Sequence, residues 1–188
     1  GTWTCVRTLE GHTGTVRDLV VHGDWLLSCS ADNTVRVWDR TSWECLRVVQ
    51  TGHTGGVFSL AVHDGKLYCG GGYDDPKIRV IDTTTWASVG VMEGHTDTVW
   101  QLLVREGKLF SCSSDKTIKM WSTGEGRACE QTLEGHTDRV YSMVMCGDKL
   151  VSSSEDSTVR VWGMEQGTGR WQCERVLQDH GDIVNYLI

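Results

Sequence analysis

Residues 11–39 read GHTGTVRDLVVHGDWLLSCSADNTVRVWD, a stretch that begins with Gly-His and ends with Trp-Asp. Apolar and polar residues alternate in three segments of this stretch, and short turns at residues 23–24 and 31–33 separate them. Alternation of this kind, with turn residues between the segments, predicts three successive strands. The following segment, SWECLRVVQ at residues 42–50, predicts a fourth. The unit is therefore expected to form one four-stranded antiparallel sheet.

The same unit returns along the chain, and its Gly-His pairs are spaced by 41 or 42 residues. A degraded fifth pair is Asp179-His180. Repetition at a fixed period indicates an architecture in which similar units stack side by side. The four units begin at His12, His53, His95 and His136, and they close with Trp38-Asp39, Ile81-Asp82, Trp121-Ser122 and Trp162-Gly163.

This Gly-His to Trp-Asp frame resembles the WD40 repeat, which forms one blade of a β-propeller. The resemblance implies an all-β fold, with a single propeller region over residues 1–188. It also implies four complete four-stranded antiparallel blades, at about residues 15–50, 56–93, 98–134 and 139–178. The phase of the pattern leaves two orphan terminal strands, at residues 2–10 and 183–188.

The number of blades determines whether the repeats can form a closed ring. Rings of the family that this chain resembles most often have seven blades, and an open arc exposes strand edges whose unpaired backbone groups invite association. We therefore expect a piece of a larger propeller. A small closed ring, or two chains that complete one ring, are the alternatives.

The composition agrees with a folded all-β chain and limits the classes of partner that are expected. The 188 residues are 39% hydrophobic, with one proline and 22 glycines, which fits short strands and tight turns better than helices. A formal charge of −7 argues against a broad basic surface, so nucleic acid is not an expected partner. No apolar run is long enough to span a membrane, and a cytoplasmic or nuclear location is expected.

The eight cysteines follow the repeat and do not form a metal-binding pattern. Cys29 and Cys112 occupy the same repeat position, and no two cysteines have the CxxC spacing. We therefore expect structural thiols in a reducing compartment, no metal site and no cofactor.

A serine, a histidine and an aspartate recur with a tryptophan in three units, and together they could suggest a hydrolase triad. A structural network is favoured because an active site is needed only once. Alternation places Ser28 on the same face as Trp38, where its hydroxyl can accept the indole N–H, although Ser30 stays possible. The resemblance implies the same hydrogen-bonded tetrads, formed by His12, Ser28, Asp32 and Trp38, by His95, Ser111, Asp115 and Trp121, and by His136, Ser152, Asp156 and Trp162.

The second unit supports this interpretation. Ile81 replaces the tryptophan and Cys69 replaces the serine, so donor and acceptor disappear together. Loss of one partner alone would leave a buried polar group unpaired, at a cost of about 1–3 kcal/mol. The nearby Gly70-Gly71-Gly72 run is interpreted as slack for an enlarged turn, because it lacks the lysine and helix of a phosphate-binding loop.

Candidate binding residues come from the position after the first valine of each unit's first strand. Family propellers bind partners largely through the face where this strand begins, so the resemblance implies a recognition surface there. Aromatic residues and arginine are common interface anchors; the alternative is that Phe58 and Trp100 only pack under loops. The candidates are Arg17, Phe58, Trp100, Tyr141 and Asn185, with Asp97, Asp138, Arg139, Tyr73 and Glu155 in adjoining loops.

These residues predict protein or peptide partners. A ligand with a basic or aromatic anchor is expected, and an acidic motif is less favoured, although Arg17 and Arg139 could receive one. The main hypothesis is a non-catalytic interaction scaffold. Its short turns resemble those of F-box and RING-type ubiquitin-ligase receptors, which predicts substrate capture. The alternatives are a structural element that oligomerises through its blade edges and an enzyme that uses the central channel.

Overall fold

The computed structural model describes residues 2–178 and 182–187, in which sixteen strands form four antiparallel sheets. Each sheet has four strands in chain order. The first sheet contains β1 (Val16–His22), β2 (Trp25–Ser30), β3 (Thr34–Asp39) and β4 (Cys45–Gln50). The second contains β5 (Val57–His63), β6 (Lys66–Gly71), β7 (Ile78–Asp82) and β8 (Ser88–Met92). The third contains β9 (Val99–Arg105), β10 (Lys108–Ser113), β11 (Ile118–Ser122) and β12 (Cys129–Leu133). The fourth contains β13 (Val140–Cys146), β14 (Lys149–Ser154), β15 (Val159–Met164) and β16 (Trp171–Leu177).

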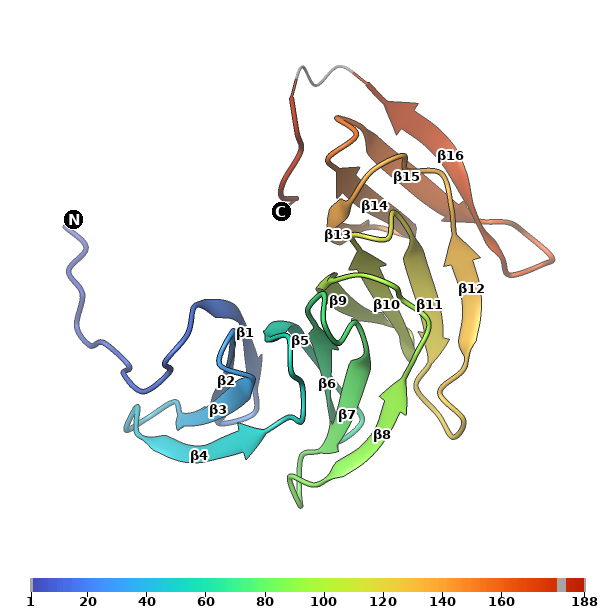
Figure 1. The fold of residues 1–188 in the computed structure, drawn as a ribbon. Coiled ribbons are helices and arrows are strands. Elements are labelled where there is room, and N and C mark those ends of the chain that lie inside the picture. Colours follow the sequence, from blue (N-terminus) through green and yellow to red (C-terminus); the bar gives the residue numbers. More distant parts are fainter. Residues whose placement is uncertain (1, 179–181, 188) are drawn as a thin grey trace.

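The sheets follow one another along an arc, with the first strand of each sheet on the inside and the fourth on the outside (Figure 1). The inner strands contact their neighbours in order, β1 with β5, β5 with β9 and β9 with β13. This arrangement confirms the predicted fold class of four four-stranded antiparallel sheets. None of the described residues forms a helix of the length and apolarity that a membrane crossing requires.

The hydrophobic core lies between successive sheets. Leu27 and Val37 of the first sheet pack with Leu60 and Leu67 of the second, and similar clusters join the second to the third and the third to the fourth. The importance of the neighbouring sheet is clear from Leu19, which is 58% exposed, whereas Leu60 at the same repeat position is 4% exposed. Full burial of a leucine side chain contributes about 1.5–3 kcal/mol, so each sheet is stabilised chiefly by its neighbours.

Side-chain hydrogen bonds between inner strands supplement this packing. Each runs from a backbone N–H of one inner segment to a side-chain oxygen of the preceding one. The donor and acceptor pairs are Leu60 N with Asp18 Oδ2 (2.8 Å), Leu102 N with Ser59 Oγ (2.9 Å), Met143 N with Gln101 Oε1, and Leu187 N with Ser142 Oγ (3.2 Å). The same repeat position therefore links all successive units.

The two expected terminal strands do not form in the described residues. Residues 2–10 and 182–187 have no strand structure, and residue 188 lies outside the described part, as do Asp179 and His180 of the degraded repeat. A strand exists only through backbone hydrogen bonds to a neighbouring strand. Residues 2–10 run apart from the sheets as an extended segment, without such a neighbour (Figure 1).

Candidate functional site

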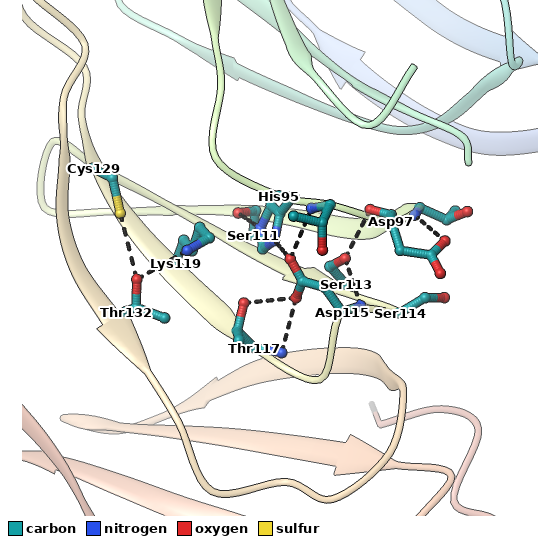
Figure 2. A network of polar contacts seen from close by, with 12 residues as sticks. His95, Asp97, Ser111, Ser113, Ser114, Asp115, Thr117, Lys119, Cys129 and Thr132 are labelled. Carbon is teal, nitrogen blue, oxygen red and sulfur yellow. Dashed lines mark hydrogen bonds and ion pairs between the residues drawn. The ribbon is translucent and has the colours of Figure 1, made fainter. Parts of the chain in front are cut away.

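The third sheet shows how the recurring polar residues are joined (Figure 2). The indole N–H of Trp121 donates to Ser111 Oγ over 2.8 Å, and the same oxygen lies 2.6 Å from His95 Nε2. His95 Nδ1 lies 2.6 Å from Asp115 Oδ2. Because an ionised carboxylate only accepts, the hydrogen bond to Asp115 places a proton on Nδ1, and in that tautomer Nε2 accepts from the serine hydroxyl. Every polar atom along this path therefore has a partner.

Asp115 anchors the outer end of the network. Its Oδ1 accepts from the backbone N–H of Thr117 at 3.0 Å and from the hydroxyl of Thr117 at 2.6 Å. Burial acts to raise the pKa of Asp115, but the hydrogen bonds from His95 and Thr117 outweigh it and lower the pKa to about 2. The aspartate therefore stays ionised and holds both the histidine and the turn between β10 and β11.

The same network is present in the first and fourth sheets. In the first, Ser28 and not Ser30 accepts from Trp38, while Ser30 Oγ accepts from the backbone N–H of Asp32. His12 joins Ser28 at 2.8 Å and Asp32 at 2.9 Å. In the fourth, the corresponding distances are 2.8 Å for Trp162 to Ser152, for His136 to Ser152 and for His136 to Asp156.

The second sheet keeps the histidine but changes its partners. His53 Nε2 lies 3.0 Å from the backbone oxygen of Cys69, and His53 Nδ1 lies 2.9 Å from Asp75 Oδ2. Asp75 also pairs with Arg79 at 3.0 Å. Asp75 was not identified from the sequence, because the enlarged turn between β6 and β7 shifts it out of the spacing seen in the other units. The available signal was its place six residues before Ile81, which matches Asp32 before Trp38 and Asp115 before Trp121.

The glycines at residues 70–72, beside this site, allow neighbouring backbone segments to approach closely; they do not serve to loosen the turn. A Cβ on Gly71 would lie 2.1 Å from the backbone oxygen of Asp75, and one on Gly72 would lie 2.1 Å from that of Gly55. A Cβ on Gly70 would lie 2.9 Å from a methyl group of Val99 on the third sheet. The earlier interpretation as slack was therefore wrong, since the glycines allow backbone segments to pack directly on one another.

The serine hydroxyls of the tetrads are buried. Ser111 and Ser152 have no exposed surface, and Ser28 is 3% exposed, so a substrate carbonyl would have no access to their hydroxyl oxygens. Each hydroxyl also accepts from a tryptophan. Within residues 2–178 and 182–187, no group of three or more histidine, cysteine, aspartate and glutamate side chains is arranged to hold a metal ion.

A groove of about 570 Å³ runs along the inner strands, and we call it the inner groove. All five candidates from the repeat position line it, namely Arg17, Phe58, Trp100, Tyr141 and Asn185. The strand register explains why the side chains of Arg17, Phe58, Trp100 and Tyr141 all point into the inner groove. The pairing of each inner strand with its neighbour shifts by one residue at this position, as in a β-bulge. A bulge re-aims one side chain relative to the alternation of the strand.

These four side chains form a continuous row, which we call the stacked row. Arg17 Cζ lies 4.8 Å from the ring centroid of Phe58. The centroids of Phe58 and Trp100 are 5.3 Å apart at 87°, and those of Trp100 and Tyr141 are 5.3 Å apart at 68°. Edge-to-face pairs at this separation are attractive beyond the area that they bury. Each sheet thus contributes one member to a single ordered surface.

The polar ends of the two larger rings are fixed from the loops. The Trp100 indole N–H donates to Ser114 Oγ at 2.7 Å, and the Tyr141 hydroxyl donates to Glu155 Oε2 at 2.9 Å. Burial and the contact with Glu155 together raise the pKa of Tyr141. Arg139 pairs with the same glutamate at 3.5 Å.

The remaining loop candidates lie outside the lining of the inner groove. Asp97 Oδ1 accepts from the backbone N–H of Thr98, and Asp138 Oδ1 accepts from that of Arg139. Tyr73 is 71% exposed. Among the residues that sequence reasoning missed, Asp18, Gln101 and Tyr186 line the inner groove, and Ser114 fixes the Trp100 ring of the stacked row.

Comparison with known proteins agrees with this architecture. The sequence model of the family described as "WD domain, G-beta repeat" matches residues 3–39, 43–82, 86–122 and 127–163. Among solved structures, the computationally designed protein Ika8 superposes with a TM-score of 0.81 at 27% identity, over 95% of this chain and 54% of Ika8.

Curated relatives match over shorter segments. The nuclear distribution protein PAC1 of Saccharomyces cerevisiae (strain JAY291) is 48% identical over 56 residues, which are 30% of this chain and 11% of PAC1. The WD repeat-containing protein pop1 of Schizosaccharomyces pombe is 41% identical over 64 residues, which are 34% of this chain and 8% of pop1. The chain thus matches about a tenth of the length of these relatives.

Proposed function

Because the chain belongs to the WD40-repeat family, we propose that it is a non-catalytic scaffold that binds protein or peptide partners in the inner groove. Repeats of this family imply a protein-interaction role, and propellers built from them are generally not enzymes. The observation that carries the proposal is the stacked row, in which four sheets present one ordered set of side chains to solvent. Arginine and large aromatic residues are the types most often found as interface anchors.

The alternative hypothesis, that Phe58 and Trp100 only pack under loops, does not compete with a role in binding. Both rings pack on neighbours in the stacked row, yet both also line an open groove. Side chains that are held by their neighbours lose little further freedom when a ligand binds, which favours affinity. Packing within the stacked row and recognition by it are therefore compatible.

The test is a quantitative pull-down from cell lysate with the full-length protein. The Trp100→Ala/Tyr141→Ala variant is compared with the wild-type protein and with Trp43→Ala. Trp43 is a matched control because it is 40% exposed in the turn between β3 and β4, at the strand ends away from the groove. We expect the double variant to lose selected partners and the control to keep them. An unchanged partner set in a folded double variant would contradict the proposal.

Within this function we propose substrate capture for a ubiquitin ligase, in the cytoplasm or nucleus. Support comes from the minimal turns between the first two strands of each blade, such as Gly23-Asp24, which resemble those of F-box and RING-type receptors. The measurement is ubiquitin transfer to proteins captured by the full-length chain. If proteins are captured but receive no ubiquitin, although ligase subunits copurify with the chain, the ubiquitin-ligase role is rejected. The chain would then be an interaction scaffold with another role.

Assembly through blade edges is a second candidate, and the bare face of β1 favours it. Val16, Leu19 and Val21 are 49%, 58% and 56% exposed, although Val57 and Leu60 at equivalent positions of β5 are buried. Sedimentation velocity of the full-length protein tests this candidate. Association that Leu19→Glu abolishes would support assembly through this face, and a monomer at micromolar concentration would exclude it.

A further inference from the structure

We infer that the inner groove recognises a peptide segment through an anionic side chain, a carboxylate or a phosphate, which binds to Arg17. An apolar side chain next to it in the peptide packs on Phe58 and Trp100. This inference rests on the proposed function, because it concerns the same groove, and it specifies the chemistry of the ligand.

Arg17 carries the argument. It is exposed, lines the groove and lies over the ring of Phe58. Such a cation–π contact uses the charge of the guanidinium and none of its N–H donors. Among the described residues, no hydrogen bond or ion pair involves this guanidinium. Its planar set of donors is thus available to a carboxylate or phosphate, which it matches in a bidentate geometry.

The carboxylates at the two ends of the stacked row are already engaged. Asp18 accepts from the backbone N–H groups of Leu19 and Leu60 and from the hydroxyl of Ser59. At the other end, Glu155 accepts from Tyr141 and pairs with Arg139. Of the two charged residues that line the groove, Asp18 is engaged and Arg17 keeps its donors, so a ligand that supplies acceptors suits Arg17.

The amide of Gln101 adds a second donor. Its Oε1 accepts from the backbone N–H of Met143, which orients the amide, and in the described part of the chain its Nε2 has no hydrogen-bond partner. Gln101 lines the same groove as Arg17. An amide that is fixed at its oxygen presents its N–H donors in a defined direction, which suits a carbonyl oxygen of the peptide backbone.

This geometry favours the opposite charge from the basic anchor expected from the sequence. A basic ligand side chain that packed on Phe58 would have to displace Arg17, which already covers the face of this ring. A ligand cation at that ring would meet a like charge at close range. The polar atoms of Trp100 and Tyr141 are bonded to Ser114 and Glu155, so these rings offer apolar surface to a neighbouring side chain.

The experiment uses four fluorescein-labelled peptide pools and the full-length protein. Each pool has randomised apolar residues around one fixed position, which is glutamate, phosphoserine, glutamine or lysine. Fluorescence anisotropy gives the affinity of each pool. We expect the glutamate or phosphoserine pool to bind roughly tenfold more tightly than the glutamine pool, the difference typical of a charge-assisted hydrogen bond. Comparison of the glutamate and phosphoserine pools distinguishes the two sources of the anion.

Two variants show where the anion binds. Arg17→Gln should remove the preference for the anionic pools over the glutamine pool. Arg47→Gln is the matched control, since Arg47 is equally charged and exposed on the outer strand β4. Preferential binding of the lysine pool, or an anionic preference that survives in Arg17→Gln, would overturn the inference.

The failure of this inference is distinguishable from the failure of the proposed function. Binding that disappears in Trp100→Ala/Tyr141→Ala but shows no anionic preference would keep the groove as a binding site and reject only its charge selectivity. If no pool binds more tightly to the wild-type protein than to that double variant, both are rejected.

Discussion

The hydroxyl of Ser59 on β5 accepts a hydrogen bond of 2.9 Å from the backbone N–H of Leu102 on β9. Ser59 is 1% exposed and donates in turn to Asp18 on β1, at 3.1 Å. One buried hydroxyl therefore connects three successive blades. Such a hydroxyl stabilises the spacing between blades and not any single blade, because both of its partners lie on other sheets.

Ser59→Ala should destabilise the protein by about 1–3 kcal/mol, because the N–H of Leu102 would stay buried without an acceptor. Denaturant unfolding measures the loss, and hydrogen exchange should quicken at the Leu102 amide. Ser88→Ala, at an exposed position of β8, is the control and should change little. Equal stability of the two variants would contradict a role for Ser59 between blades.

Ser111 and Trp121 should be energetically coupled. Ser111→Ala removes the acceptor of the buried indole N–H, and Trp121→Phe removes the donor but keeps an aromatic ring. The double variant should therefore be more stable than the sum of the single losses predicts, by about 1 kcal/mol. A double-mutant cycle from denaturant unfolding measures this coupling. Additive losses would show that the hydrogen bond contributes nothing measurable.

The ionisation of Asp115 should contribute to stability above mildly acidic pH. The pKa of Asp115 is about 2 in the folded chain, against an ordinary value of 3.8. The unfolded chain therefore binds more protons between these values, so the stabilisation is complete above about pH 4 and is lost as the pH falls towards 2.

The corresponding variant tests this pH dependence. Asp115→Asn should lower stability at neutral pH by about 2 kcal/mol and reduce the steepness of the acid limb of the unfolding curve. The control is Asp24→Asn, in the exposed turn between β1 and β2. A variant whose acid limb is as steep as that of the wild-type protein would refute the assignment.

Gly72→Ala should disturb the stacked row without substituting any of its members. A Cβ at Gly72 would lie 2.7 Å from Cε2 of Phe58 and 2.1 Å from the backbone oxygen of Gly55. We expect a loss of about 1–3 kcal/mol in stability and altered ring resonances of Phe58 by NMR. Gly124→Ala is the control, because its added Cβ would meet nothing closer than 3.6 Å. Unchanged Phe58 resonances would show that the turn yields instead of the ring.

The cysteines should divide into two groups by reactivity. Cys29, Cys69 and Cys112 are buried, and burial raises the pKa of each thiol, whereas Cys5, Cys45, Cys129 and Cys146 are exposed. Thiolates are the reactive form. A thiol-specific reagent followed by mass spectrometry should label the exposed group rapidly and the buried group only on unfolding. Rapid labelling of Cys69 in the folded protein would indicate opening between the first two blades.

Much of the fold could be predicted because the repeat makes one local pattern visible several times. The strands, the turns and the residues brought together around Ser111 lie within one unit, where alternation and spacing determine which side chains meet. Asp75 was not predicted, because an insertion in its own turn changes its spacing from His53. The missing terminal strands show the limit of local pattern, since residues 2–10 have the sequence of a strand but no neighbour with which to pair.

Features that depend on two blades at once could not be predicted in this way. The hydrogen bonds of Asp18 and Gln101 cross from one blade to the next, and their geometry depends on the angle between sheets. No sequence pattern predicts the register shift at Arg17, Phe58, Trp100 and Tyr141 either. The repeat position of these four residues was visible, whereas their ring-to-ring contact was not.

The stacked row has a mechanical consequence for ligand binding. Each of its four members is attached to a different blade, so the distance between neighbouring rings varies with the angle between the blades that carry them. A ligand that wedges two rings apart must rotate two rigid sheets and strain the hydrogen bonds between their inner strands. The width of the groove between neighbouring rings therefore depends on the curvature of the arc.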